Sequence, residues 1–356
     1  MTWNQDIGWN EFFEEQRGRL DQNSIRVARV INGQKSQYKA LAESGEIYLK
    51  VLGRMLQNPD LPGSLPVVGD WVVYDPVPGE DKGVISSILQ RFNSISRKAI
   101  GKRSGRQIIA ANIDIMFIVS SFDSDFSINR LERYVTIAKS NHTKPIIILN
   151  KVDLVNDAEN YISKVKQSLS DITILTMSAL KKIGVESILE NIGKRKTSMM
   201  VGSSGVGKST LINELLGEER QKVEEVREGD DKGRHTTSTR DLFILPNGGM
   251  IIDNPGMREV QLWLDENELL LSFTDIEELS MGCRYANCQH IEEPSCAVKE
   301  AIKGGTLSQR RLESYHKQMK ELKFLSNRSD IAAQRVEERN LYKTYKQAQS
   351  RKKSKR

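Results

Sequence analysis

The order of two short motifs constrains the fold of this 356-residue sequence most strongly. Residues 150–153 read NKVD, the NKxD form that recognises guanine, and residues 202–209 read GSSGVGKS, the GxxxxGKS form of a phosphate-binding loop. In ordinary GTPases the phosphate loop precedes the guanine motif along the chain. We therefore expect an α/β P-loop GTPase core whose elements are circularly permuted.

The phosphate loop is expected to lie between a strand and a helix, as such loops do in nucleotide-binding proteins. An apolar strand is expected before the loop and a helix after it, from Ser209 to Leu216. Gly202 and Gly207 let the backbone approach the phosphates, so that N–H groups and the helix N-terminus face them. Lys208 can reach the β- and γ-phosphates and is a candidate catalytic residue, while the hydroxyl of Ser209 can bind Mg²⁺.

The preference for guanine depends on Asp153. Its carboxylate can accept two hydrogen bonds from guanine, and adenine lacks one of the two donors. The motif follows an apolar strand expected at Pro145–Leu149, and Ser178 and Ala179 follow the next strand, where GTPases often add a backbone contact to the guanine oxygen. The residues expected to bind GTP are Asn150, Lys151, Val152, Asp153, Ser178, Ala179, Gly202, Ser203, Ser204, Gly205, Val206, Gly207, Lys208, Ser209, Thr210, Asp253 and Gly256.

The sequence also contains candidate groups for hydrolysis. A DxxG sequence begins at Asp253, which would hold Mg²⁺ through water, and ends at Gly256, whose N–H would sense the γ-phosphate. Residues 229–239 have the character of a mobile segment whose Thr completes the Mg²⁺ shell. Thr236 and Thr237 are both candidates, and we favour Thr237. The expected magnesium ligands are Ser209, Thr237 and Asp253.

The residue after DxxG is Met257. An apolar side chain cannot orient the attacking water, so we expect slow intrinsic hydrolysis. His235 is the nearest candidate catalytic group, because imidazole can orient water or accept a proton from it. Two alternatives stay open: His235 is structural, or a partner completes the site, as activating proteins do for other GTPases.

The residues before the core have the pattern of a small barrel. Between about Ile25 and Ile95, five short segments, mostly alternating or β-branched, are separated by turns rich in Gly, Pro and Asn. Five strands at this spacing suit an OB-fold, which binds oligonucleotides in some proteins and is a scaffold in others; both roles stay open. A basic Gly/Ser/Lys stretch, Arg97–Arg106, is interpreted as a linker to the alternating strands and helices of the core.

All three cysteines lie in one window, Cys283-x4-Cys288-x-His290-x5-Cys296. An odd number of cysteines grouped with a histidine is poorly explained by disulfides. Three thiolates and one imidazole make the closed tetrahedral donor set of a structural Zn²⁺ site. Reduced, buried cysteines are the alternative interpretation.

Positive charge is concentrated at the C-terminus. The net charge of the chain is +6, yet residues 310–356 carry 15 Lys and Arg against 5 Asp and Glu. Together with the basic residues at 97–106, this asymmetry favours RNA as a partner over a merely solvated helix. No apolar run approaches the ~20 residues that cross a bilayer, and the first residues lack the pattern of a secretory signal. We therefore expect a cytoplasmic protein with no membrane partner.

The ordered set of motifs resembles the circularly permuted, small-ribosomal-subunit-dependent GTPases of the RsgA (YjeQ/YloQ) family. The resemblance covers nearly the whole chain and includes the barrel, NKVD before GSSGVGKST, the GRHTT segment with His235, DxxG and the Cys/His cluster. Asn254 departs from the family, which usually has Thr at that position. The Asp and Gly of DxxG stay in place, so little is put in doubt.

The resemblance implies a domain order. It consists of an N-terminal extension at 1–22, an all-β OB-fold barrel at 23–98, the permuted GTPase core at 107–272, and a C-terminal helical zinc-binding domain with a basic tail at 273–356. It also implies that the protein binds the small ribosomal subunit and its rRNA, hydrolyses GTP under stimulation by that subunit, and assists its late maturation. A factor that docks on a much larger particle need not self-associate, so we expect a monomer, and other oligomeric states stay open. One structural Zn²⁺ is implied at the Cys/His cluster.

Two other classes of protein stay open. One is an RNA-binding regulator in which GTP is only a structural ligand, and intact Lys208, Ser209 and Asp253 argue against it. The other is a P-loop ATPase or kinase, which the context of Asp153 disfavours.

Overall fold

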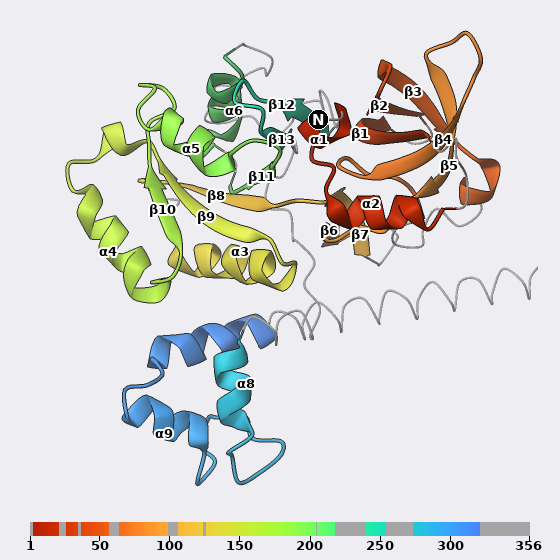
Figure 1. Cartoon of the computed structure of the whole chain (residues 1–356). Coiled ribbons are helices and arrows are strands. Elements are labelled where there is room, and N and C mark those ends of the chain that lie inside the picture. Colours follow the sequence, from red (N-terminus) through yellow and green to blue (C-terminus); the bar gives the residue numbers. More distant parts are fainter. Residues whose placement is uncertain are drawn as a thin grey trace, which may run out of the picture. The chain divides into compact units, whose positions relative to one another are not determined.

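The structure, a computed structural model, describes residues 3–20, 26–34, 37–56, 64–98, 106–123, 126–203, 205–217, 240–253 and 273–320. The chain divides into two units, residues 1–97 with 108–262 and residues 98–107 with 263–356. Figure 1 labels the helices and strands in chain order. Among the described residues, no helix is both long and apolar enough to cross a membrane.

The first part of the chain forms the five-stranded barrel that the alternating pattern predicts. Its elements are β1 (Arg26–Gln34), β2 (Gln37–Ala42), β3 (Gly45–Val51), the 3-10 helix η1 (Gly53–Leu56), β4 (Trp71–Pro76) and β5 (Lys82–Ile88). The strands pair in the order β1-β2-β3-β5-β4, and β4 pairs back with β1, so the sheet closes. Alternate side chains of β2 and β3 are buried, as a barrel interior requires. The OB-fold prediction is confirmed.

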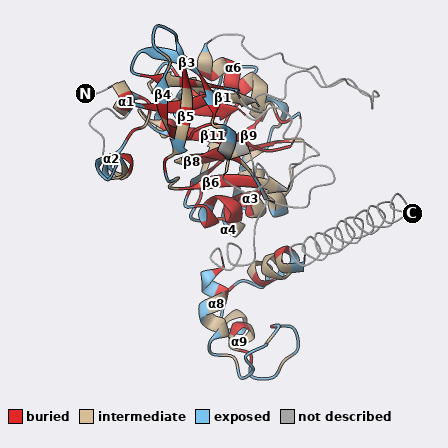
Figure 2. Ribbon diagram, turned by 90° about the vertical axis from the view of Figure 1, so that its right-hand side faces the viewer, coloured by how far each residue is buried: buried red, intermediate tan, exposed pale blue. Residues whose placement is uncertain are grey.

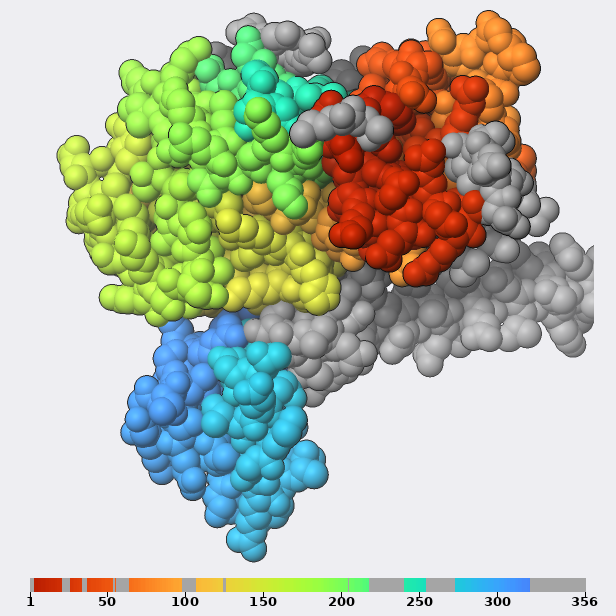
Figure 3. All heavy atoms as spheres, in the orientation of Figure 1, coloured from red at the N-terminus to blue at the C-terminus, as the bar shows by residue number. Residues whose placement is uncertain are grey.

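Two short helices, α1 (Trp3–Asp6) and α2 (Glu11–Gly18), precede the barrel. Trp9 packs edge-on against the fully buried Trp71 of β4, with 4.7 Å between ring centroids, and the ring of Phe13 lies 6.0 Å from the same indole. The helices therefore cover part of the barrel surface (Figure 3, red). Residues 1–22 were expected only as an extension; the packing of the described part, residues 3–20, depends on residues distant in the sequence.

The core of the first unit is a mainly parallel sheet in the order β10-β9-β8-β11-β13-β12. Its strands are β8 (Ile115–Ser121), β9 (Lys144–Asn150), β10 (Thr173–Thr176), β11 (Thr197–Val201), β12 (Asp241–Ile244) and β13 (Met250–Asp253). The helices are α3 (Ile128–Ser140), η2 (Val152–Leu154), α4 (Ala158–Ser168), α5 (Val185–Ile192) and α6 (Lys208–Leu216). All residues of β8 and β11 are buried, as in strands covered on both faces (Figure 2).

The direction of the strands decides where a site can form. The strands β10, β9, β8, β11 and β13 run parallel to their neighbours in that order, whereas β12 forms an antiparallel hairpin with β13. The carboxyl ends of five strands therefore lie at one edge of the sheet, where open α/β sheets bind ligands. The strand expected at Pro145–Leu149 and the helix expected at Ser209–Leu216 are confirmed as β9 and α6, and α5 was not predicted.

The basic stretch interpreted as a linker is shorter than predicted. Strands β6 (Ser94–Lys98) and β7 (Arg106–Ala111) pair with each other across it. Arg97 and Arg106, assigned to the linker, therefore belong to strands, and residues 99–105 lie outside the described part of the chain. A Gly/Ser/Lys composition predicts a loop, but strand pairing depends on the partner segment as well.

The barrel and the core share one sheet, a feature that the sequence did not predict. Strand β1 pairs antiparallel with β12 at Asn32 and Asp241, and the Asn32 amide donates to the Asp241 carboxylate. Arg29 of the same strand is buried; it donates to Thr197 Oγ1 at 2.7 Å and to the backbone carbonyl of Ile7. Burial lowers the pKa of Arg29 to about 10. The barrel, the N-terminal segment and the core thus meet at one guanidinium.

The second unit has a small core of its own. It contains α8 (Thr274–Ser280), α9 (Ala297–Lys303) and a helical stretch at residues 309–320. Phe273, Ile276, Val298 and Leu312 are buried together with Cys296. A core of this size is marginal by itself, since small domains bury too little apolar surface and often depend on a metal.

Candidate nucleotide site and metal centre

The phosphate loop runs from the end of β11 to the start of α6 and requires glycine at two positions. A Cβ atom on Gly202 would lie 2.2 Å from the carbonyl oxygen of Val119, and one on Gly207 would lie 2.3 Å from Nδ2 of Asn150. Both glycines also have positive φ angles, 150° and 93°. The motif glycines therefore let the loop lie directly against the ends of β8 and β9.

Asn150, the last residue of β9, joins three segments. Its side-chain Nδ2 donates to the carbonyl of Val206 at 2.8 Å, and its Oδ1 accepts from the N–H of Ala179 at 3.0 Å. The side chain is buried, so both bonds are protected from water. The NKVD motif, the phosphate loop and the Ser178–Ala179 loop, separated in sequence, are therefore brought together by one amide.

The last three residues of the NKVD motif, Lys151, Val152 and Asp153, are positioned in different ways. Lys151 has a left-handed backbone with φ of 65°, and its Nζ lies 3.0 Å from the carboxylate of Asp123. Val152 is held by a 3.0 Å bond from its N–H to the carbonyl of Met177. Asp153 is exposed, so its carboxylate can reach a ligand. Asp123 was not predicted; it follows β8 without a motif to mark it.

Two basic side chains contact the first half of the phosphate loop. Lys208 Nζ donates to the carbonyl oxygens of Gly202 at 2.8 Å and Ser203 at 2.5 Å. The guanidinium of Arg130, from the first turn of α3, donates to the hydroxyl of Ser203. Lys208 was predicted from the motif, whereas Arg130 was not. The positive end of the α6 dipole adds to these charges, so the loop is suited to anions.

A buried carboxylate lies at the same edge of the sheet. Asp253 ends β13, which runs parallel to β11, and its exposed fraction is only 7%. Ser209 lies in the first turn of α6, at the end of the loop. A carboxylate and a hydroxyl are oxygen donors of the type that Mg²⁺ prefers. Seven of the residues discussed for the site lie outside the described part of the chain: Ser204, His235, Thr236, Thr237, Asn254, Gly256 and Met257.

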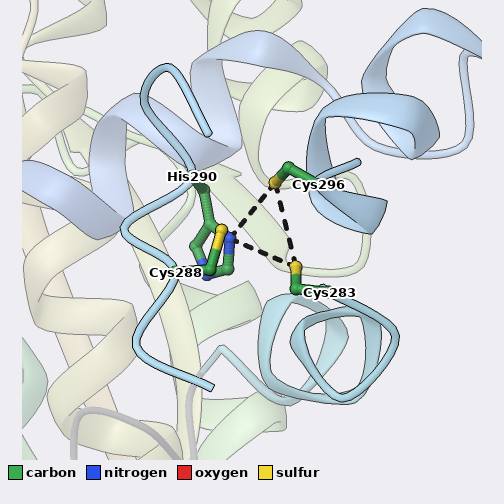
Figure 4. Close-up of side chains that lie close together, drawn as sticks. All are labelled: Cys283, Cys288, His290 and Cys296. Carbon is green, nitrogen blue, oxygen red and sulfur yellow. Dashed lines mark hydrogen bonds between the residues drawn. The ribbon is translucent and has the colours of Figure 1, made fainter. Parts of the chain in front are cut away.

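The predicted metal cluster is assembled in the second unit. One donor atom from each of Cys283, Cys288, His290 and Cys296 lies within 4.8 Å of the others (Figure 4). Cys283 Sγ lies 3.8 Å from Cys296 Sγ and 3.6 Å from His290 Nδ1. A tetrahedral Zn²⁺ with ordinary bond lengths would separate two sulfurs by about 3.8 Å and a sulfur from a nitrogen by about 3.6 Å. The spacing of the Cys283, His290 and Cys296 donors is therefore close to that around a zinc-sized tetrahedral ion, and Cys288 lies within 4.8 Å of them.

The loop that carries two of these ligands is fixed by a carboxylate. Glu293 accepts from the backbone N–H groups of Gln289 at 2.7 Å and Ile291 at 2.9 Å, on either side of His290. These bonds lower the pKa of Glu293 to about 2. Burial, together with the neighbouring sulfurs, raises the pKa of the Cys288 thiol to about 11. A bound cation would reverse this preference, because coordination deprotonates a thiol.

Comparison with known proteins agrees with this architecture. A sequence model described as RsgA GTPase matches residues 88–263. The chain is 39% identical over 344 residues to the small ribosomal subunit biogenesis GTPase RsgA 2 of Vibrio vulnificus, covering 97% of this chain and 94% of that protein. It is 38% identical over 330 residues to the small ribosomal subunit biogenesis GTPase RsgA of Methanosarcina acetivorans, covering 93% and 88%.

Solved structures give the same result. The crystal structure of YjeQ from Thermotoga maritima is 26% identical with a TM-score of 0.63, and the match covers 84% of this chain and 99% of that one. The crystal structure of YloQ, described as a circularly permuted GTPase, is 26% identical with a TM-score of 0.61, covering 86% and 97%.

Fold and motif order together define this chain as a circularly permuted GTPase with an OB-fold barrel and a C-terminal region whose Cys/His cluster could hold a metal ion. The extent of the sequence matches then fixes its group: the chain belongs to the RsgA GTPase family.

Proposed function

We propose that this protein hydrolyses GTP while bound to the small ribosomal subunit and its rRNA, and that it assists the late maturation of that subunit. The observation that carries the nucleotide part of the proposal is the junction at Asn150, whose amide holds the phosphate loop and the Ser178–Ala179 loop together. The ribosomal part is supported by the names of relatives that match nearly the whole chain.

GTP would be bound at the carboxyl edge of the sheet. Asp153 would accept from the guanine edge, and the N–H groups after Ser178 would face the guanine oxygen. Asn150 and Lys151 would support the base from the end of β9. The loop and first turn of α6 would bind the phosphates with Gly202, Ser203, Ser204, Gly205, Val206, Gly207, Lys208, Ser209 and Thr210.

Magnesium would be held by Ser209 directly and by Asp253 through water, and its chemistry is to neutralise charge on the β- and γ-phosphates. Thr237 is proposed as the third ligand and Gly256 as the sensor of the γ-phosphate. Lys208 would stabilise charge on the transferred phosphoryl group. His235, or the ribosomal subunit itself, would orient the attacking water, because Met257 cannot.

Zinc is the ion that we propose for the Cys/His cluster. Three sulfurs and one nitrogen exhaust a tetrahedral shell, so the ion would be structural and leave no position for substrate. It would connect the loop around His290 to α9, which begins directly after Cys296. The small core of the second unit would then be stable enough to present a fixed surface.

The proposal places the protein in the cytoplasm as a monomer, since a factor that docks on a much larger particle need not self-associate. The excess of basic residues at 310–356 supports contact with rRNA, because lysine and arginine neutralise backbone phosphates.

The decisive experiment measures GTP turnover by the purified protein alone, with small ribosomal subunits and with large ones. Lys208→Ala is the blank, because it removes the phosphate-loop cation. We expect slow turnover by the protein alone and a rise of about 100-fold or more with small subunits only. A slow rate that small subunits leave unchanged would refute the ribosomal part, and no turnover above the Lys208→Ala blank would refute the hydrolytic part.

A further inference from the structure

Helix α3 brings an arginine to the phosphate loop that none of the nucleotide motifs contains. Arg130 lies in the first turn of this helix, and its Nη1 donates to the hydroxyl of Ser203, the second residue of the loop. Helix α3 follows β8, and β8 pairs with the strand that leads into the loop. The contact therefore follows from the packing of two adjacent strand-to-helix connections.

Ser203 is held from two sides. Its hydroxyl accepts from Arg130, and its backbone carbonyl accepts from Lys208 Nζ at 2.5 Å. The two cations thus share one residue of the loop. Arg130 therefore places a second cationic side chain on the residue of the loop that Lys208 also contacts.

We propose that Arg130 is a positioning residue for GTP hydrolysis: it anchors Ser203 in the phosphate loop and directs a second positive charge toward the phosphates beside Lys208. This inference rests on the proposed nucleotide site. Phosphoryl transfer depends on fixed positions and on stabilising charge that develops on the phosphoryl oxygens. A guanidinium suits both tasks, because it is always charged and its planar donors hold a fixed orientation.

The position of Arg130 also matters for the slow intrinsic hydrolysis that Met257 predicts. Met257 cannot orient water, and other GTPases receive an arginine from a partner protein or from their own chain. Arg130 would supply such a charge from α3 in the free protein. It acts on the loop rather than on water, so it would raise the basal rate without replacing the group that the ribosomal subunit provides.

Four variants test the proposal: Arg130→Ala, Arg130→Lys, Ser203→Ala and the control Lys139→Ala. Lys139 lies on the same helix, and its ion pair with Asp171, 2.6 Å long, is exposed and belongs to the far end of α3. For each protein, kcat and KM for GTP, the Kd of fluorescent GDP and the thermal unfolding midpoint are measured, with saturating Mg²⁺ and without ribosomal subunits.

We expect Arg130→Ala to lower kcat by about 10- to 100-fold, the range for losing one positioned donor near developing charge. The Kd of GDP should change by less than about threefold, because GDP lacks the transferred phosphate. Arg130→Lys should have a kcat between those of Arg130→Ala and the unmodified protein, since lysine keeps the positive charge but lacks the planar donors of the guanidinium. Ser203→Ala should lower kcat less than Arg130→Ala, because it removes the anchor and keeps the charge.

Two results would overturn the proposal. One is an Arg130→Ala protein whose kcat and KM match those of Lys139→Ala. The other is a parallel loss of kcat, GDP binding and thermal stability that Arg130→Lys does not restore, which would make Arg130 a purely structural contact. Absence of GTP turnover by the unmodified protein would refute the hydrolytic function itself, and it is therefore distinguishable from either result.

Discussion

Replacing Asn150 by alanine tests whether one buried amide holds the nucleotide site together. The substitution removes two hydrogen bonds, from Nδ2 to the Val206 carbonyl and from the Ala179 N–H to Oδ1. Each bond contributes about 1 kcal/mol net, and each unpaired buried group left behind costs about 1–3 kcal/mol. Partial relaxation and water entry reduce the sum. We therefore expect the free energy of unfolding to fall by about 2–4 kcal/mol.

The same change should weaken nucleotide binding. The phosphate loop and the Ser178–Ala179 loop would no longer be held in one arrangement before the ligand arrives, and binding would have to supply that order. If ordering the two loops takes about half of the lost free energy from binding, about 1.4 kcal/mol, the Kd for GDP rises about tenfold. Asn150→Asp should bind GDP at least as poorly, because it places a carboxylate oxygen against the Val206 carbonyl.

Urea unfolding and titration with fluorescent GDP measure both quantities. The matched control is Asn191→Ala on α5, where Nδ2 donates to the Ser187 carbonyl at 2.8 Å in an exposed position. This control should lose less than about 0.5 kcal/mol, since water can replace the bond. The reasoning fails if Asn150→Ala unfolds at the same urea concentration as the control and binds GDP with unchanged Kd.

Three further predictions concern other parts of the chain. Asp153→Asn should lower GTP affinity by about 100-fold or more and raise XTP affinity, because an amide can donate to the xanthine oxygen; competition between the two nucleotides measures this. Cys296→Ser should abolish stoichiometric zinc and expose residues 273–320 to trypsin, while GDP binding by the other unit persists. Burial raises the pKa of Tyr38 to about 12, so its contribution to stability is complete below pH ~10 and is lost as pH rises through 12. Between pH 9 and 11.5, the free energy of unfolding of Tyr38→Phe, measured by urea unfolding, should therefore fall less than that of the unmodified protein.

Local patterns predicted the parts of the fold whose signals are local. The barrel strands have a period of two in their burial, and the phosphate loop requires Gly202 and Gly207 for close backbone approach. The four candidate metal ligands lie within a short window, so their spacing alone predicted that they would be grouped. In each case the interacting residues are near one another in the sequence, or the motif itself specifies the backbone.

Contacts between segments that are distant in the sequence could not be predicted from local patterns. Arg29 lies in an alternating strand where a charged residue would ordinarily face water, yet it is buried and bonded to Thr197, far along the chain. Arg130 and Asp123 are unmarked residues after β8, and only the folded sheet brings them to the loop and to Lys151. Pattern analysis assigns a residue to an element, but its partner depends on topology.

The pairing of β1 with β12 explains how the permuted core is completed. Strand β12 would otherwise end the sheet with unpaired backbone groups, and such an edge invites association with other chains. Strand β1 covers part of that edge at Asn32, and Arg29 binds Thr197 at the start of β11. The opposite end of β11 leads into the phosphate loop. The fully buried β11 therefore runs from a contact with the barrel strand at its start to the phosphate loop at its end. Because close packing resists displacement, the barrel is a structural part of the GTPase unit.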